Sequence, residues 1–178
     1  MKALLNKFSN YFARNFQESS RELFSVLNSR AIESSAEFIE KNSDHLTNYY
    51  SNHWKMRADT LEKVPSSGML IEFGVNRGRS ANFFSNILDQ RSDPRPYFGF
   101  DTFTGLTEDW GGVTLAGTFN RNGVHPLLNK RVTIINGDIL ETLNPFLSQN
   151  EKSIAFIHID TDTYTPCSHI LKLCKKNL

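Results

Sequence analysis

The sequence predicts an α/β fold in which a mostly parallel, doubly wound sheet carries helices on both faces. Short apolar runs that suit buried strands alternate with amphipathic segments that suit helices. A glycine-bearing turn follows the first run, at 69–73, and leads into a helical pattern that begins at 80. Acids follow the later runs. The order strand, glycine turn, helix is typical of the start of a nucleotide-binding unit.

Length and composition favour a soluble protein with one main domain. The chain has 178 residues and a net charge of +1, so no charge bias indicates nucleic acid or an anionic membrane as a partner. Polar residues from Asn6 onward interrupt an initially apolar N-terminus, which argues against a signal peptide. Cys167 and Cys174 lie two helical turns apart, too far for a disulfide. We therefore expect a cytoplasmic protein with reduced thiols.

Residues 1–64 are predicted to form an N-terminal helical segment, with residues 65–178 as the second domain. An aromatic stripe opens the segment, and a second amphipathic piece follows it; the stripe consists of Leu4, Phe8, Tyr11, Phe12 and Phe16. Packing against the rest of the chain is the preferred interpretation of the stripe. A contact in a homo-oligomer and a lid over a site are the alternatives.

The segment 49–64 is predicted to be another helix, ending at the turn 65–68. Segments that precede the first strand partly cover the ligand in many proteins of this plan. Tyr49, Tyr50 and Trp54 are therefore candidates for substrate contact, although packing in the core is the preferred interpretation.

The first strand, 69–73, carries Glu72 near its end and is followed by Gly74 and Gly78. Glycine permits a sharp turn and close approach of a ligand to the backbone. A dinucleotide site has the pattern Gly-x-Gly-x-x-Gly, whereas this chain has Glu-x-Gly-x-x-x-Gly. The spacing thus disfavours an NAD-type oxidoreductase. A purely structural turn remains an alternative.

The second strand, 97–101, ends in Asp101. An acid at this place in a βαβ unit accepts hydrogen bonds from ribose hydroxyls; capping of the following turn is the alternative. The loop 102–125 is long and contains glycines and aromatic residues. Long loops in compact domains are usually functional or disordered, and the aromatics argue against disorder. We expect this loop to form a wall of the site, with a short helical turn.

The third strand and its exit span 131–138. In a doubly wound sheet that binds an adenine-containing ligand, this exit lies beside the adenine. Asp138 could accept a hydrogen bond from the exocyclic amine, and Ile139 could pack on the ring. A helix N-cap is the alternative role of Asp138.

The run 153–160 predicts a strand that is buried on both faces. It delivers Asp160 and Asp162 to the carboxyl edge of the sheet, where ligands bind. Two such carboxylates suit a general base or a hard cation such as Mg²⁺. His158, inside the strand, is interpreted as a hydrogen-bonded core residue, with catalysis as the alternative. A helix begins near Pro166.

Taken together, these segments resemble the macrocin-type O-methyltransferases, a family of class I S-adenosylmethionine (AdoMet) methyltransferases. The first segment that carries the resemblance, Ile-Glu-Phe-Gly-Val-Asn-Arg-Gly-Arg-Ser, is shared by many methyltransferases. The more specific segments are Phe-Gly-Phe-Asp-Thr-Phe-Thr-Gly-Leu-Thr-Glu-Asp-Trp and His-Ile-Asp-Thr-Asp-Thr-Tyr, and Gly-Thr-Phe and Asn-Gly-Asp lie between them in the same order. The resemblance covers residues from about 68 to 178.

The resemblance implies a Rossmann-like methyltransferase domain that binds AdoMet and methylates a hydroxylated small molecule, with a sugar-like acceptor as one option. It implies Asp160 and Asp162 as the acids that deprotonate the acceptor or bind Mg²⁺. The implied cofactor-binding residues are Glu72, Gly74, Val75, Asn76, Gly78, Ser80, Asp101, Thr102, Asp138 and Ile139.

The family fold continues for three strands beyond the helix that begins near Pro166, whereas this sequence stops at Leu178. The expectation is therefore a C-terminally truncated domain with four strands in the order 3-2-1-4 and the strand 154–159 at an edge. A non-catalytic remnant, or a half-domain that depends on a partner, is the alternative function.

Overall fold

A computed structural model of the chain describes residues 2–44, 48–112 and 114–177, with only the backbone for residues 2–21. The chain divides into two compact units, the first ending at Tyr49 and the second beginning at Tyr50. The division into a helical segment, 1–64, and a methyltransferase domain, 65–178, stays a prediction.

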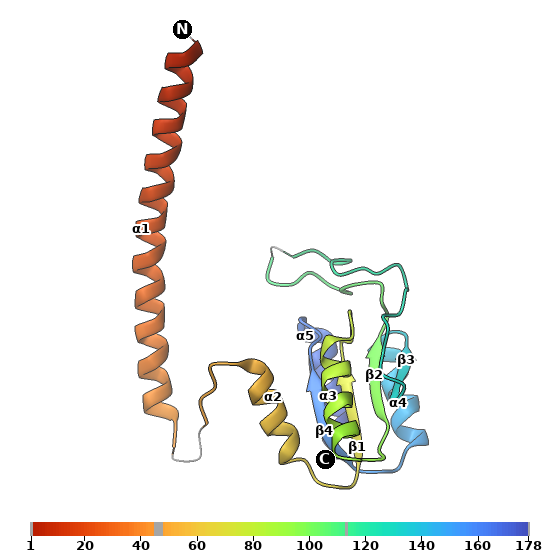
Figure 1. Cartoon of the computed structure of the whole chain (residues 1–178). Helices are drawn as coiled ribbons and strands as arrows, with labels where there is room; N and C mark the ends of the chain where they lie inside the picture. The colour runs from red at the N-terminus through yellow and green to blue at the C-terminus, as the bar shows by residue number, and fades with distance from the viewer. Residues whose placement is uncertain (1, 45–47, 113, 178) are drawn as a thin grey trace. The chain divides into compact units, whose positions relative to one another are not determined.

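The first unit consists mainly of one long helix, α1 (Lys2–Asn42) (Figure 1). The sequence pattern had suggested two successive amphipathic pieces, but the helix is continuous because 2–42 contains neither glycine nor proline. All the described side chains of α1, from 22 to 42, are exposed, including Phe24 and Phe38. The side chains of the aromatic stripe lie outside the described residues, and its partner stays a prediction.

The second unit is built on a four-stranded sheet in the order β3-β2-β1-β4, and all neighbouring strands are parallel. This confirms the α/β fold and the strand order expected from the sequence. The strands are β1 (Met69–Phe73), β2 (Tyr97–Asp101), β3 (Val132–Asn136) and β4 (Ile154–Ile159).

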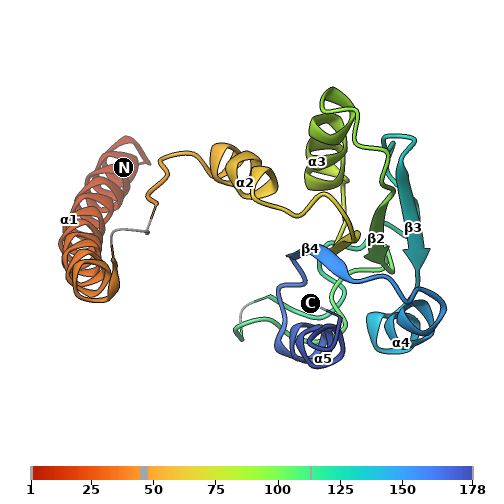
Figure 2. The same cartoon turned by 90° about the horizontal axis from the view of Figure 1, so that it is seen from below.

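Helices cover both faces of this sheet, as Figure 2 shows. The helices of this unit are α2 (His53–Glu62), α3 (Arg79–Gln90), α4 (Ile139–Gln149) and α5 (Tyr164–Cys174). One face packs against α3, whose Phe84 lies against Tyr97 of β2 and Phe156 of β4. The opposite face packs against α4 and α5 through Phe146 and Ile170. The helices α3, α4 and α5 each bury several side chains on one side, which is the condition for a doubly wound sheet to fold.

Burial differs sharply between the strands. Every residue of β1 is buried, because β1 has a strand on each side and helices on both faces. In β4 only Ile154 and Phe156 are buried, and the others are half-buried. The expectation that this strand would be buried on both faces is therefore wrong for β4, which is an edge strand here, and describes β1 instead.

Two further expectations concern the whole chain. Cys167 and Cys174, both on α5, are free thiols, as the spacing predicted. Within the residues that the structure describes, no helix has both the length and the apolar character required to cross a bilayer.

Candidate active site

A cavity of about 460 Å³ lies where the carboxyl ends of the strands meet. This size is in the usual range for a small-molecule site. Residues that follow all four strands contribute to its wall, together with the loop after β2. Tyr49, Tyr50 and Trp54, the candidates for substrate contact, do not line the cavity. Of the residues predicted to bind the cofactor or to act in catalysis, all except Glu72 and Gly78 line it: Gly74, Val75, Asn76, Ser80, Asp101, Thr102, Asp138, Ile139, Asp160 and Asp162.

The turn after β1 brings three strand exits together. Gly74 donates its N–H to the carbonyl of Phe100 at 2.9 Å, and Asp160 donates its N–H to the carbonyl of Phe73 at 2.8 Å. Gly74 has φ of +88°, and a Cβ at this position would overlap the backbone carbonyl of Asp160. Only glycine therefore fits here, because both the backbone angle and the space exclude a side chain.

Asp101 fastens this turn to the exit of β2. Its carboxylate accepts from the N–H of Asn76 and from the N–H of Phe103, each at 2.6 Å. The predicted capping role of Asp101 is thus present in the structure. Asp101 is nevertheless only half-buried and lines the cavity, so the carboxylate also faces the space that a ligand would occupy.

Backbone strain concentrates around the cavity. Among the described residues, six that are not glycine have positive φ, and four of them line the cavity: Asn76, Phe103, Phe119 and Asp162. Side chains rarely adopt this conformation, and the surrounding fold must hold them there. Such clustering is typical of functional sites.

Asp160 and Asp162, the two acids after β4, lie in the wall of the cavity. Burial, and secondarily the charge of Asp160, raise the pKa of Asp162 above its usual value. A carboxylate with a raised pKa is a stronger base. Asp162 also holds φ of +62°, which fixes the direction of its side chain.

A magnesium site is not supported. In the described part of the chain, no three His, Cys, Asp or Glu side chains come together as metal ligands. Asp160 and Asp162 are only two carboxylates, and a Mg²⁺ ion held by them would need waters or ligand oxygens to complete its coordination. No step of the chemistry is therefore assigned to a metal.

Asp138 begins α4 and also lines the cavity. Its carboxylate accepts from the N–H of Leu140 at 2.8 Å, so the N-cap interpretation is confirmed. Ile139 lies beside it in the cavity wall. A contact of either residue with an adenine stays a prediction.

Glu72 and Gly78 differ from the other predicted cofactor residues, because neither lines the cavity. Glu72 is fully buried and accepts hydrogen bonds from Ser80 Oγ at 2.6 Å and from the hydroxyl of Tyr97 at 2.8 Å. Burial raises its pKa to about 7, although both hydrogen bonds oppose the shift. Gly78, with φ of +71°, precedes α3 and faces Leu128. Both residues support the turn, and a contact of either with the cofactor stays a prediction.

His158 also stays away from the cavity. Its ring packs edge-on against Phe84, with centroids 5.3 Å apart, which fits the core interpretation. The predicted hydrogen bond is missing at Nε2, which is buried and has no partner within the described ranges. Burial, and then the charge of Arg57, lower the pKa of His158, so the ring stays neutral.

The loop after β2 folds back on itself and forms an arm over the site. Leu106 and Thr118 are hydrogen-bonded, and Trp110 pairs with Thr114 near the tip. Glu108 accepts from both the N–H and the hydroxyl of Thr165, at 2.8 and 2.7 Å, and so fastens the arm to α5. The loop lines the cavity as expected. The expected helical turn is absent from 102–112 and 114–125.

Sequence reasoning missed several cavity residues. They include the arginines Arg77, Arg79 and Arg121. Phe103 and Phe119 of the arm also line the cavity, as expected from the prediction that the loop 102–125 forms a wall. The signal for Arg77 and Arg79 was present, because they flank Gly78 inside the glycine motif. The position of Arg121 could not be inferred, since it depends on how the arm folds.

Comparison with known proteins identifies the family. A family described as a methyltransferase domain matches residues 71–178. The match covers more than half of the chain, and the chain belongs to this family of methyltransferase domains. Among curated proteins, none matches the chain.

Solved structures share the fold. CalS11, a calicheamicin methyltransferase, is 25% identical with a TM-score of 0.55, over 69% of this chain and 59% of its own. The O-methyltransferase NovP is 20% identical with a TM-score of 0.51, over 70% of this chain and 60% of its own. The chain thus spans about three fifths of the length of these structures. The narrower macrocin-type assignment stays a prediction.

Proposed function

We propose that the chain is the AdoMet-binding part of an O-methyltransferase that acts on a hydroxylated small molecule. One observation carries the proposal. A single cavity gathers the turn after β1 together with acids from the ends of β2, β3 and β4. In open α/β sheets this edge is where ligands bind.

The cavity residues fit AdoMet without rearrangement of the turn. Asp101 has one backbone hydrogen bond on each carboxylate oxygen, which leaves acceptor capacity on both for the two ribose hydroxyls. Asp138 caps α4 through Oδ1 and keeps its other oxygen for an adenine amine. Gly74 offers a backbone surface with no side chain in the way.

Bound AdoMet would supply an electrophilic methyl group on its sulfonium. The task of the chain is then to position an acceptor oxygen in line with that methyl group and to remove the proton of the hydroxyl. Asp162 is our candidate for the base, because it lines the cavity and its pKa is raised. Asp160, two positions earlier in the chain, would orient the acceptor.

A sugar hydroxyl is the acceptor we propose to test first. CalS11 is described as a TDP-rhamnose 3′-O-methyltransferase, and it shares the fold of this chain. Dependence on Mg²⁺, assembly into a homo-oligomer and a cytoplasmic location stay predictions.

The proposal is tested in two stages with the full chain. Calorimetric titration with S-adenosylhomocysteine is expected to give micromolar binding, with and without Mg²⁺. Transfer of a radiolabelled methyl group from AdoMet to a panel of hydroxylated sugars, TDP-rhamnose included, then tests activity. Binding without transfer to any acceptor would favour the non-catalytic alternative, and a folded chain that does not bind S-adenosylhomocysteine would refute the proposal.

A further inference from the structure

The ring of Trp54 on α2 lies near two arginines, one on α2 and one at the start of α3. Its ring centroid is 4.8 Å from that of Phe83 on α3. The guanidinium carbon of Arg57 lies 4.9 Å from the ring centroid of Trp54, and that of Arg79 lies 5.8 Å from it. Cations at such distances over an indole are attracted by its π system. Trp54 is therefore placed to attract the exposed side chain of Arg79 at the start of α3.

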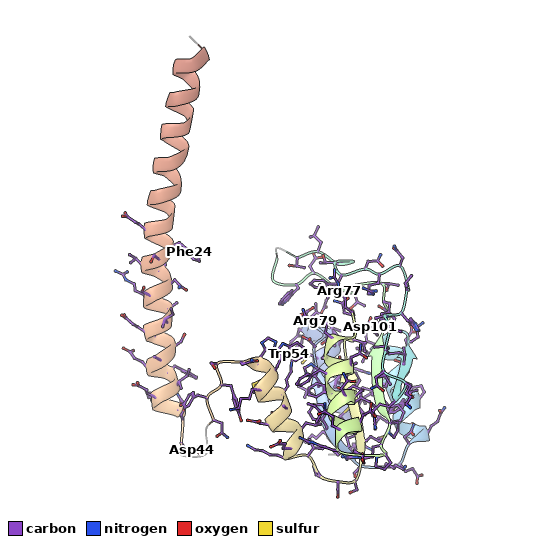
Figure 3. All side chains as sticks on the ribbon, in the orientation of Figure 1. Phe24, Asp44, Trp54, Arg77, Arg79 and Asp101 are labelled. Atoms are coloured by element: carbon purple, nitrogen blue, oxygen red, sulfur yellow. The ribbon has the colours of Figure 1, made fainter. Side chains whose placement is uncertain are left out.

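Arg79 differs from Arg57 in one respect that concerns function. Arg79 lines the cavity, whereas Arg57 does not. In the described part of the chain, the ion pairs join Arg91, Arg95 and Arg131 to nearby acids, and Arg79 has none. Figure 3 shows Arg77 and Arg79 near the end of the sheet that carries Asp101, with Trp54 beside α3. An arginine without a carboxylate partner, held at a cavity wall, is available for an anionic group of a ligand.

The order of the strands indicates which anionic group this is. The sheet runs β3-β2-β1, so Asp138, Asp101 and the turn after β1 follow one another along the cavity. A ligand with its adenine at Asp138 and its ribose at Asp101 places its remaining end over the turn that contains Arg79. In AdoMet that end is the amino acid, whose α-carboxylate is the only carboxylate of the molecule.

We propose that Arg79, held in position by Trp54, binds the α-carboxylate of AdoMet. This inference rests on the proposed function, because it requires that AdoMet occupies the cavity. Trp54 is a positioning residue in this account, since it acts through Arg79. The arginine thereby distinguishes AdoMet from nucleosides that lack the amino acid part.

The test compares two ligands that differ only at this end. S-adenosylhomocysteine carries the carboxylate, whereas 5′-methylthioadenosine has the same adenine, ribose and sulfur but no amino acid part. Calorimetric titration of Arg79→Gln is expected to show about tenfold to hundredfold weaker binding of S-adenosylhomocysteine, the range for a hydrogen bond to a charged group. Binding of 5′-methylthioadenosine should stay unchanged, and Arg79→Lys should restore part of the loss.

Matched variants separate the effect of the position of Arg79 from the effect of removing any cation near the Trp54 ring. Arg57→Gln removes the other cation over the same ring and should change the affinity for S-adenosylhomocysteine by about twofold or less. Trp54→Leu should weaken the binding of S-adenosylhomocysteine but not that of 5′-methylthioadenosine. Trp54→Phe, which keeps an aromatic ring, should weaken this binding less. Circular dichroism checks that each variant is folded.

Three results would overturn the inference while leaving the proposed function intact. In the first, Arg79→Gln binds S-adenosylhomocysteine as the parent does. In the second, it loses both ligands equally. In the third, it retains S-adenosylhomocysteine but loses TDP-rhamnose, which would assign Arg79 to the phosphates of an acceptor. A parent chain that binds neither nucleoside would instead refute the proposed function.

Discussion

Glu72 and Asp101 occupy neighbouring strands and were both expected to bind the cofactor, yet their surroundings differ. Glu72 lies inside β1, with β2 and β4 on its flanks, and its carboxyl group accepts hydrogen bonds from Ser80 and Tyr97. Asp101 is the last residue of β2, and its half-buried carboxylate lines the cavity. Glu72 is level with Gly99 of β2. A difference of two residues in depth across the sheet thus separates an acid that supports the fold from one that lines the cavity.

The largest effect is expected at the cavity edge, at Asp162. Asp162→Asn removes the proposed base and should slow methyl transfer by about 10²- to 10⁴-fold, the usual contribution of a general base. The affinity for S-adenosylhomocysteine should be retained, because the product carries no proton to remove. Transfer is measured with whichever acceptor the parent methylates. The exposed Glu151→Gln serves as the control, and equal rates for Asp162→Asn and the control would exclude Asp162 as the base.

The next effect concerns the buried acid and its dependence on pH. The pKa of Glu72 is about 7 in the fold against an ordinary value of 4.5, so the folded chain holds the proton more tightly than the unfolded chain. The resulting stabilisation is complete below pH 4.5 and is lost as the pH rises through about 7. The full change is about 3 kcal/mol at most.

Glu72→Gln, which is neutral at every pH, should therefore be more stable than the parent at pH 8 and should lose less stability between pH 5 and pH 8. Urea unfolding followed by circular dichroism measures both chains. Parallel pH profiles would mean that Glu72 is ionised, or solvated, in the folded chain.

A smaller effect is expected for Asp101→Asn. The substitution keeps one acceptor oxygen but removes the charge, so binding of S-adenosylhomocysteine should weaken about tenfold to hundredfold. Because S-adenosylhomocysteine and 5′-methylthioadenosine share the ribose, the binding of 5′-methylthioadenosine should weaken by the same factor. This pattern contrasts with the selective loss expected for Arg79→Gln. A selective loss at Asp101 would remove the ribose assignment.

The smallest effect is expected at the arm over the site. Glu108→Gln weakens the hydrogen bonds to Thr165, which also hold the pKa of Glu108 below its usual value. The arm should then open more often, and limited proteolysis near Trp110 should be faster while the unfolding temperature is unchanged. Thr165→Val, which removes the hydroxyl partner, should accelerate cleavage in the same way, and unaltered cleavage in both variants would show that this contact does not hold the arm.

The sequence predicted the strands, their order and most of the cavity wall, because parallel strands deliver their final residues to one edge. It did not separate Glu72 from Asp101, since depth along a strand depends on where the following turn begins. Burial of β4 was overestimated because its apolar run predicted cover on both faces, whereas the edge position expected from the strand order leaves most of its residues only half-buried. The contact between Trp54 and Arg79 could not be predicted from the sequence, because it depends on how α2 packs on α3.

The most direct test of the account is a crystal structure of the chain with S-adenosylhomocysteine. The account predicts the adenine beside Asp138 and Ile139, the ribose hydroxyls about 3 Å from the carboxylate of Asp101, and the α-carboxylate at Arg79. A ligand bound outside the cavity, or one whose ribose lies away from Asp101, would contradict it.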